Sequence, residues 1–364
     1  MRTALALVLL CFSTVAAADW RAEVLRLAFA SDADSAVALA EAERTPWLAP
    51  HIARILRPPD AYLGWVLTPT HAVAYLAGDE PAVRVLPLPD SFGADVRELA
   101  GGLRAHGPTP QEAIQRVRAA LFEPIADWLV EHPAWVFAPD GVLASLPWPL
   151  ISEFPVVLAV SERGAALSSH RAVRARDRPP TLLAYARTAL PAARAEIELA
   201  ARALGGDATL LSGPGALDVL RAAAYDGTLS AARFILVAAH AEVRDGAIVL
   251  ELGAGADARY APSDTVHLQF GAELVVLSAC ETAVGARFAH AAIFAGVGQT
   301  LLTQWRIDDA ASAQFVAALF TALGRGTPVH TALTETQLAF AGGHHGARYA
   351  HPYYWAGWVL WGGL

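Results

Sequence analysis

A short apolar run, Leu274 to Leu277, breaks abruptly into the small and reactive residues SACET at positions 278 to 282. Apolar runs of this length, rich in β-branched residues, are typical of buried strands in a parallel sheet. A second such run, Phe234 to Ala239, leads directly into His240. The carboxyl ends of neighbouring parallel strands meet at one edge, where open α/β sheets place their chemistry. We therefore expect Cys280 and His240 to lie together.

The pairing of a thiol with an imidazole indicates a cysteine nucleophile, because the imidazole raises the fraction of reactive thiolate. We predict Cys280 as the nucleophile and His240 as its base; the stretch of chain between them is long enough for one crossover between parallel strands. The backbone N–H groups of Cys280 and Ala241 are the candidate donors to the oxyanion. Two plainer interpretations stay open: His240 as a hydrogen-bonded core histidine, and Cys280 as a small buried hydrophobe.

The order of elements along the chain predicts an α/β fold. From residue 181 onward, apolar runs alternate with amphipathic segments, which favours a mostly parallel central sheet flanked by helices. Residues 62 to 88 alternate as paired strands do, so the preceding part of the domain is β-rich. Residues 19 to 56 have apolar positions at helical spacing and predict a short helical lead-in, which the sequence Arg57-Pro58-Pro59 ends.

Three segments before residue 181 have more specific patterns. Residues 110 to 130 predict a helix, and residues 134 to 150 predict a strand, a turn at Pro139-Asp140-Gly141 and a second strand. The tryptophans of the latter segment, Trp135 and Trp148, are expected to be core anchors. Residues 168 to 180 hold four arginines and end in two prolines, which indicates an exposed loop or linker.

Composition excludes several classes of function. Of the 364 residues, 55% are hydrophobic and 17% charged, so a large core is expected and disorder is not. A net charge of −8 without any basic tract argues against binding to nucleic acid. The sequence has neither a phosphate loop with lysine nor a Gly-x-Ser-x-Gly elbow. We expect no cofactor. We also expect no metal site, since five histidines outside the predicted dyad lack ligand spacing with carboxylates or other cysteines: His267, His290, His344, His345 and His351.

The segment from position 1 to position 18 has the pattern of a signal peptide, with a charge at Arg2, an apolar centre at positions 4 to 12 and small side chains at 16 to 18. We therefore expect a periplasmic or secreted protein with no stable membrane insertion after removal of the signal, and an uncleaved anchor stays the alternative. Cleavage would also remove Cys11, so that Cys280 is the one remaining thiol and no intramolecular disulfide can form.

Five ordered motifs resemble those of CHAT domains, the bacterial branch of the caspase-like and separase-like cysteine peptidases. They are WVFAPDGVLASLPW at 135 to 148, which looks like the family's early hairpin, LPAARAEI at 190 to 197, VVLSACETAVG at 275 to 285, WRIDD at 305 to 309 and HPYYWAGW at 351 to 358. The resemblance implies a caspase-like fold for a CHAT domain over residues 60 to 364, with the catalytic half at about 181 to 364. Residues 19 to 59 would then form the separate lead-in.

The resemblance also implies a cysteine endopeptidase that cleaves a protein or peptide substrate. In separase-like relatives, an acidic residue a few positions after the tryptophan of WRIDD binds a basic substrate side chain. Asp309 fits that place, with Asp308 beside it, so the implied preference is an arginine or lysine before the cleaved bond. Glu281 is a further candidate for orienting substrate. The alternative is that Asp308 or Asp309 caps the following helix, where a carboxylate is favourable.

The chain departs from the family pattern in two places. Ala241 stands where the family usually has glycine, and alanine disfavours a positive φ at a predicted oxyanion donor. The family's Gly-Glu-Gly element after the cysteine is missing, since Gly285 leads almost directly into an apolar segment. Both departures favour the alternative of a catalytically impaired module that acts in protein–protein interaction. Another acyl-transfer reaction by the same dyad is a third interpretation. A regulatory partner stays open throughout, because caspase relatives often need processing or dimerisation.

Overall fold

The computed structural model describes residues 17–44, 61–77, 80–129, 134–186, 191–206, 208–211, 216–244, 247–252, 259–279, 281–283 and 286–364. Its strands are β1 (Tyr62–Leu67), β2 (His71–Leu76), β3 (Ala82–Pro87), β4 (Trp135–Ala138), β5 (Val156–Leu158), β6 (Leu182–Ala186), β7 (Thr209–Leu211), β8 (Phe234–Ala238), β9 (His240–Arg244), β10 (Ala247–Glu251), β11 (Arg259–Tyr260), β12 (Leu274–Ser278), β13 (Gln299–Thr303) and β14 (Trp358–Trp361). Its α-helices are α2 (Ala17–Phe29), α3 (Ala33–Arg44), α4 (Phe92–Arg104), α5 (Gln111–Phe122), α6 (Ala126–Leu129), α7 (Trp148–Ile151), α8 (Glu162–Arg176), α9 (Pro191–Ala203), α10 (Ala216–Tyr225), α11 (Thr228–Ala231), α12 (Pro262–Thr265), α13 (Arg287–Ala295), α14 (Asp309–Gly324) and α15 (Val329–Ala341). Short 3-10 helices are η2 (Glu123–Ile125), η3 (Gly141–Ser145), η6 (Ala347–Ala350) and η7 (Pro352–Tyr354).

A continuous central sheet of 11 strands runs through the described part of the chain, in the order β3-β2-β1-β4-β5-β14-β13-β12-β8-β6-β7. Neighbouring strands are parallel except at β1–β2, β2–β3 and β13–β14, where they are antiparallel. Strand β8 is buried along its whole length and β12 up to its last residue, as expected for parallel strands that are covered on both faces. The prediction of a mostly parallel central sheet is confirmed.

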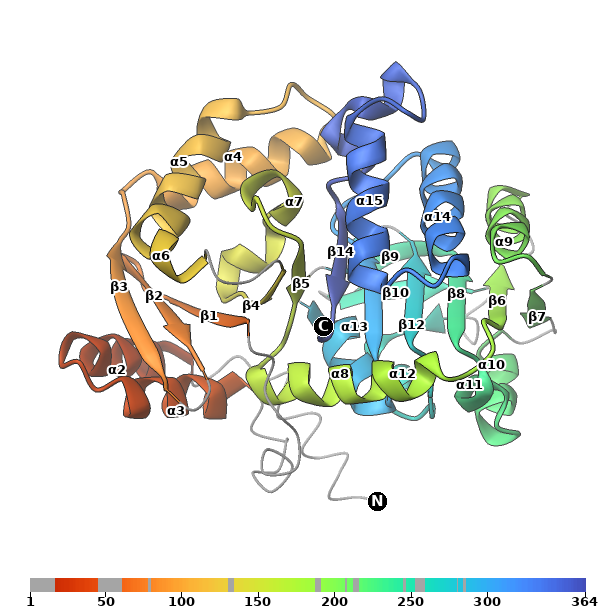
Figure 1. Cartoon of the computed structure of the whole chain (residues 1–364), viewed down its shortest axis with the longest axis horizontal. Coiled ribbons are helices and arrows are strands. Elements are labelled where there is room, and N and C mark those ends of the chain that lie inside the picture. Colours follow the sequence, from red (N-terminus) through yellow and green to blue (C-terminus); the bar gives the residue numbers. More distant parts are fainter. Residues whose placement is uncertain are drawn as a thin grey trace.

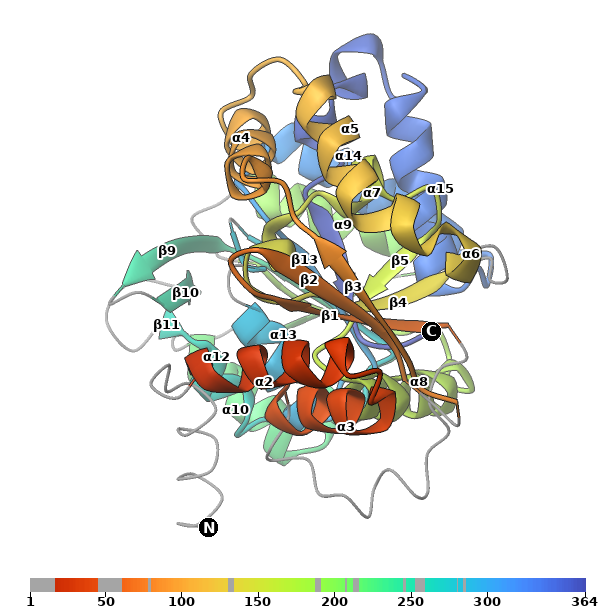
Figure 2. The same ribbon diagram turned by 90° about the vertical axis from the view of Figure 1, so that its left-hand side faces the viewer.

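Helices cover both faces of this sheet. Figures 1 and 2 show α4, α5, α14 and α15 on one face and α2, α3, α8 and α13 on the other. The contact of α8 with the sheet is close at Gly298, where a Cβ atom would lie 2.8 Å from the Cα atom of Ala172. The structure therefore confirms the predicted α/β fold with flanking helices.

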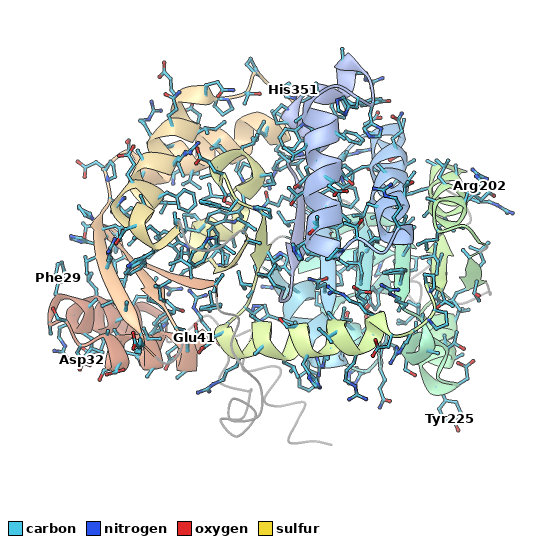
Figure 3. All side chains as sticks on the ribbon, viewed as in Figure 1. Phe29, Asp32, Glu41, Arg202, Tyr225 and His351 are labelled. Carbon is cyan, nitrogen blue, oxygen red and sulfur yellow. The ribbon has the colours of Figure 1, made fainter. Side chains whose placement is uncertain are left out.

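The helical lead-in forms a pair, α2 and α3, that packs on the antiparallel strands at one end of the sheet. A separate apolar cluster joins the two parts and includes Val24, Val37, Val66 and Val73. At its edge, the buried carboxylate of Glu41 accepts hydrogen bonds from the hydroxyls of Tyr62 and Tyr75, each at 2.6 Å. The same carboxylate accepts the backbone N–H of Glu162 at 2.8 Å, so it also reaches the start of α8 (Figure 3).

A small antiparallel sheet, in the order β11-β10-β9, lies beside the central sheet. Figure 2 shows it projecting to one side of the molecule. Its strand β9 begins at His240, two positions after the end of β8. The sequence analysis did not predict this sheet, which makes the predicted base the first residue of a strand.

The predicted hairpin over residues 134 to 150 is wrong. Strand β4 is followed by η3 and α7, and the next strand, β5, pairs with β4 in parallel. The cause is visible in the sequence, because Pro147 and Pro149 cannot donate to a strand ladder. The apolar side chains of Leu143, Leu146 and Trp148 are nevertheless buried. The apolar residues of this segment therefore pack into the core from short helical turns rather than from a strand.

The expectation of an exposed loop over residues 168 to 180 is also wrong, because most of this segment belongs to α8. The helix begins after Ser161, whose hydroxyl accepts the N–H of Gly164 at 3.0 Å. Its arginines are used inside the fold: Arg171 donates to the carbonyl of Ile293, and Arg176 donates to the buried carboxylate of Glu273 at 2.7 Å. An arginine-rich stretch that covers a sheet is thus amphipathic rather than simply solvated.

Two predictions fall largely outside the described residues. The proposed signal peptide does so except for its last two positions, and the end of the lead-in at Arg57-Pro58-Pro59 does so entirely. Within the ranges given above, no helix combines the length and the apolar character that a membrane crossing requires.

Candidate active site

The two strands predicted to carry the dyad are direct neighbours and end side by side. Strands β8 and β12 are parallel, and Ala238 at the end of β8 is the register partner of Ser278 at the end of β12. The N–H of Ala239 donates to the carbonyl of Ser278 at 3.2 Å, which extends the pairing by one residue. His240 follows Ala238 by two positions, as Cys280 follows Ser278 in the sequence.

Cys280 lies outside the described residues, so the predicted distance between its sulfur and the imidazole of His240 is untested. The residues on either side of it are described. Ala279 is buried, and Glu281 is part of a turn. The Cys280/His240 dyad therefore stays a prediction.

Two threonines hold the chain just before and after residue 280 against the end of β13. The hydroxyl of Thr303 donates to the carbonyl of Ala279, and the hydroxyl of Thr282 accepts the N–H of Thr303 at 2.9 Å. The N–H of Ala283 then donates to the carbonyl of Thr303 at 2.9 Å. Both hydroxyls are buried and hydrogen-bonded, so they fix this turn. The sequence analysis gave Thr303 no role; its signal was a polar residue at the end of an apolar strand.

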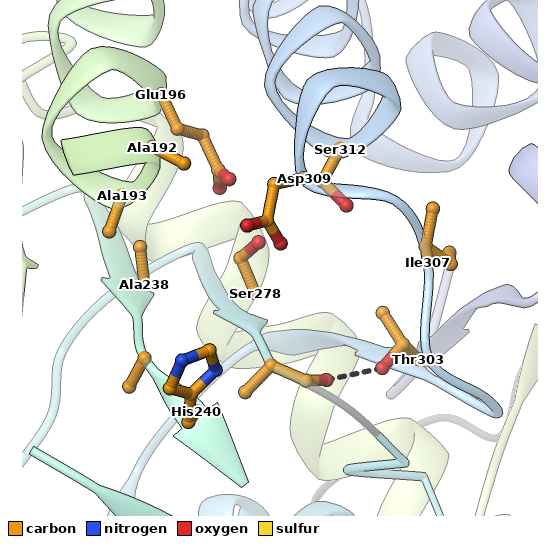
Figure 4. Close-up of a pocket in the computed structure, with 12 residues that line it drawn as sticks. Ala192, Ala193, Glu196, Ala238, His240, Ser278, Thr303, Ile307, Asp309 and Ser312 are labelled. Carbon is orange, nitrogen blue, oxygen red and sulfur yellow. Dashed lines mark hydrogen bonds between the residues drawn. The ribbon is translucent and has the colours of Figure 1, made fainter. Parts of the chain in front are cut away.

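A pocket opens at these strand ends and contains two of the predicted site residues, His240 and Asp309 (Figure 4). It encloses about 510 Å³ of space, including its open mouth. Its walls consist mainly of small side chains, which leave room for a longer side chain to enter: Ala192, Ala193, Ala238, Ala239, Ser278 and Ser312. The pocket thus joins the end of the β8 and β12 strands to the start of α14.

The two aspartates of WRIDD have different surroundings. Asp308 is the N-cap of α14, and its carboxylate accepts the N–H of Ala311 at 3.1 Å. It also lies 3.6 Å from a guanidinium nitrogen of Arg348. Asp309, the first residue of α14, lines the pocket instead. The capping alternative therefore describes Asp308, while the position of Asp309 is compatible with contact to a substrate.

Glu196 of α9 is a pocket residue to which the sequence analysis gave no role. Its side chain is 5% exposed and lines the pocket together with Asp309 and Ser278. Burial raises the pKa of its carboxyl group to about 8; the Ser278 hydroxyl opposes the rise and the negative charge of Asp309 adds to it. The available signal was its place as the glutamate of the LPAARAEI motif.

Ala241 is extended, as the second residue of β9, and is the register partner of Leu250 in β10. An extended backbone is open to any residue, so alanine is unstrained where the family has glycine. The predicted role of the Ala241 N–H as an oxyanion donor is untested.

Glu281 has a left-handed backbone, with φ of 59°, although it is not a glycine. Such a conformation costs about 1–2 kcal/mol and is often found next to functional sites. Its carboxylate lies 3.6 Å from a guanidinium nitrogen of Arg104 in α4, with the Glu281 side chain 29% exposed. The structure thus pairs Glu281 with Arg104 and does not include it among the residues that line the pocket.

The histidines outside the pocket have other surroundings. His290 of α13 is partly buried, and burial of its ring lowers its pKa to about 4. The Nδ1 atom of His351 accepts the N–H of Tyr353 at 3.2 Å and so caps η7. In the described part of the chain, no three histidine, cysteine, aspartate or glutamate side chains come together closely enough to hold a metal ion.

Comparison with solved structures finds distant similarity. The complex of the pro- and mature domains of Porphyromonas gingivalis RgpB aligns over 76% of this chain and 77% of its own, with 10% identity and a TM-score of 0.45. The Arg-specific cysteine proteinase gingipain R aligns over 76% and 75%, with 9% identity and a TM-score of 0.44. The Saccharomyces cerevisiae separase–securin complex aligns over 69% of this chain and 17% of its own, with 13% identity and a TM-score of 0.42.

Sequence comparison identifies the family. No curated protein sequence matches the chain. The sequence profile of the CHAT domain matches residues 111–363, which is well over half of the chain and includes the strands and helices that form the pocket. The chain therefore belongs to the CHAT domain family.

Proposed function

We propose that this chain is a cysteine endopeptidase in which Cys280 is the nucleophile and His240 its base. The main support is the register of β8 and β12, in which Ala238 and Ser278 are partners and the two candidate residues each follow by two positions. His240 lines a pocket that also contains the carboxylate of Asp309. Membership of the CHAT family adds to this support.

The reaction begins when His240 removes the proton of the Cys280 thiol. The thiolate forms a bond to the carbonyl carbon of the substrate amide, and the carbonyl oxygen becomes an oxyanion. As the carbonyl re-forms, the carbon–nitrogen bond breaks and the imidazolium of His240 donates its proton to the departing amine. Water then attacks the thioester with His240 as base, the carbon–sulfur bond breaks, and the thiol returns with release of the acid.

The oxyanion needs donors that are already in place, each worth about 3 kcal/mol in comparable sites. The backbone N–H groups of Cys280 and Ala241 are our candidates. For the latter, the extended backbone of β9 supplies a rigid support that needs no glycine.

The substrate is a protein or peptide with a basic residue before the cleaved bond. The support is Asp309, a pocket carboxylate that can bind a guanidinium or ammonium group. The pattern of residues 1–18 supports a location in the periplasm or outside the cell, and cell fractionation of the full chain tests this part of the proposal. No cofactor and no nucleic acid takes part, and a regulatory partner remains compatible with the scheme.

The test is cleavage of a fluorogenic peptide library that varies only the residue before the scissile bond. We expect cleavage after arginine or lysine, and we expect Cys280→Ala to abolish it with little change in melting temperature. Cys11→Ser serves as the matched control in the full chain, because it removes the other cysteine, which lies in the predicted signal peptide. Equal rates with and without Cys280 would refute the proposal. Failure to cleave any peptide would favour the impaired module, which acts through protein–protein interaction.

A further inference from the structure

One oxygen of the Glu196 carboxyl group, Oε1, is buried and has no hydrogen-bond partner among the described residues. The side chain as a whole is 95% buried, since it is 5% exposed. A carboxyl oxygen that is removed from water without a partner costs free energy, and in native proteins such groups usually have a function or a missing partner. The position of Glu196 indicates which partner is missing.

Glu196 points into the pocket toward the same space as Asp309. Figure 4 shows the two carboxyl groups approaching from different helices, α9 and α14, above the hydroxyl of Ser278. These two helices pack closely against each other. Among the described residues that line the pocket there is no arginine, and the chain has no lysine. Two acidic groups therefore share a partly enclosed space that contains no cationic side chain from the described part of the chain.

The other polar groups near α9 are engaged or lie at the far side of the pocket. His240 lies beyond Ser278 in Figure 4. On β6, the hydroxyl of Tyr185 donates to the carbonyl of Leu252. On α9 itself, Arg194 and Glu198 form an exposed pair at 3.2 Å. Within the described ranges, Asp309 is thus the charged group that faces Glu196, and it comes from the neighbouring helix.

We propose that Glu196 is a second specificity-determining carboxylate, which binds the cationic side chain of a peptide substrate together with Asp309. This proposal rests on the proposed function, because it assigns the bound group in the same pocket. The small side chains of the pocket walls leave space for the aliphatic part of an arginine or lysine, and the two carboxylates bind its charged end. A guanidinium suits this arrangement, since its five donors can reach carboxyl groups on two sides.

Binding of the cation would change the protonation of Glu196. Without a bound cation, burial and the neighbouring Asp309 keep the carboxyl neutral at pH 7, since its pKa is raised to about 8. A guanidinium beside the group favours the carboxylate instead, so its proton leaves to the solvent as the side chain enters. The net reaction is exchange of one proton for one organic cation, and no covalent bond of the substrate changes. Affinity for a basic peptide should consequently rise with pH up to about 8, by at most about tenfold per pH unit.

The test measures binding rather than cleavage, so that it does not depend on the dyad. In the inert Cys280→Ala background, a tetrapeptide amide that ends in arginine is titrated calorimetrically in two buffers of different ionisation enthalpy. A matched peptide with norleucine in place of arginine is the control. We expect release of nearly one proton per arginine peptide at pH 7, and none with norleucine. Glu196→Gln should abolish the release and should weaken arginine binding most strongly at pH 8.5 and above.

Each outcome decides between the proposals. Two results would overturn the role of Glu196: arginine-selective binding without proton release, or proton release that persists in Glu196→Gln. In either case Asp309 alone would bind the cationic side chain. Absence of arginine selectivity would overturn both pocket roles, whereas cleavage after neutral residues would keep the peptidase proposal. If Glu196→Gln fails to fold, proton release by the Cys280→Ala protein is followed from pH 6 to 10. It should disappear above about pH 9, and a constant release would contradict the proposal.

Discussion

Ala238 and Ser278 are register partners on the neighbouring parallel strands β8 and β12. This relationship links the two motifs of the candidate site, although they are far apart in the sequence. A slip of one residue in this pairing would turn the side chains of one strand to the opposite face of the sheet. Because both strands are buried on both faces, such a slip would require the core to repack on each side of the sheet, so close packing helps to fix the geometry of the pocket.

The first prediction concerns the reactivity of Cys280. We expect rapid alkylation by iodoacetamide below pH 7 that slows at least about tenfold in His240→Ala, because an unassisted thiol has a pKa of about 8.5. The measurement is the pH dependence of the labelling rate in a Cys11→Ser background, where one thiol reacts. Slow labelling that does not respond to loss of the imidazole would exclude the dyad.

The second prediction separates the two aspartates of the WRIDD motif. Asp309→Ala should reduce cleavage after arginine far more than cleavage after neutral residues, because it removes a pocket carboxylate. Asp308→Ala should instead lower the free energy of unfolding by about 1 kcal/mol, since it removes the N-cap of α14. The measurements are kcat/KM for peptides that differ in one residue, and urea denaturation of both variants.

These aspartate variants serve as controls for each other. The two residues are adjacent in the sequence. The carboxylate of Asp308 accepts a backbone N–H, whereas Asp309 lines the pocket. A uniform loss of activity in Asp309→Ala, together with lower stability, would show that its role is structural.

The central part of the fold could be predicted because its strands are almost wholly apolar. The runs that became β8, β12 and β13 are bounded by small or polar residues, and the helices between them have clear apolar faces. The wrong predictions concern segments whose secondary structure depends on tertiary contacts. Residues 141 to 151 are apolar enough for a strand but contain two prolines, and the arginines of α8 find carbonyl and carboxylate partners that no local pattern reveals.

The site was predicted less completely than the fold. His240 and Asp309, which the motifs singled out, line one pocket, and their roles stay predictions. Motif spacing could not identify Glu196, because a glutamate in an amphipathic helix is ordinarily assigned to the solvent-exposed side. It also could not tell that Glu281 faces Arg104, which comes from α4 in the first third of the chain. Such pairs depend on the packing of separate elements rather than on sequence spacing.

The third prediction concerns Ala241. Because this residue is extended within β9, we expect Ala241→Gly to leave kcat unchanged and to lower the free energy of unfolding by about 0.5–1 kcal/mol through greater backbone freedom. The measurements are steady-state kinetics and urea denaturation. A marked increase in kcat would mean that the alanine restrains a backbone that must turn toward the oxyanion.

The fourth prediction concerns the attachment of the lead-in. Glu41→Ala leaves the hydroxyls of Tyr62 and Tyr75 and the N–H of Glu162 without their acceptor. Since a buried group without its partner costs about 1–3 kcal/mol, we expect a loss of at least about 2 kcal/mol in urea denaturation. The control is Glu43→Ala, an exposed position on the same helix that should change stability by less than about 0.5 kcal/mol. Equal effects of the two variants would contradict the role of the Glu41 network.

The last prediction concerns the pH dependence of stability that Glu196 creates. The folded chain holds this proton up to about pH 8, whereas an ordinary glutamate releases it near pH 4.5. Between these values the folded state binds more protons than the unfolded state, so the free energy of unfolding falls as pH rises toward 8 and then levels off. With about 1.4 kcal/mol for each pKa unit, the loss is on the order of 5 kcal/mol. Glu196→Gln should therefore gain stability relative to the wild type between pH 5 and pH 9 in urea denaturation, whereas Glu198→Gln, on the exposed side of α9, should follow the wild type. A difference between Glu196→Gln and wild type that stays constant with pH would mean that Glu196 is ionised without a bound cation.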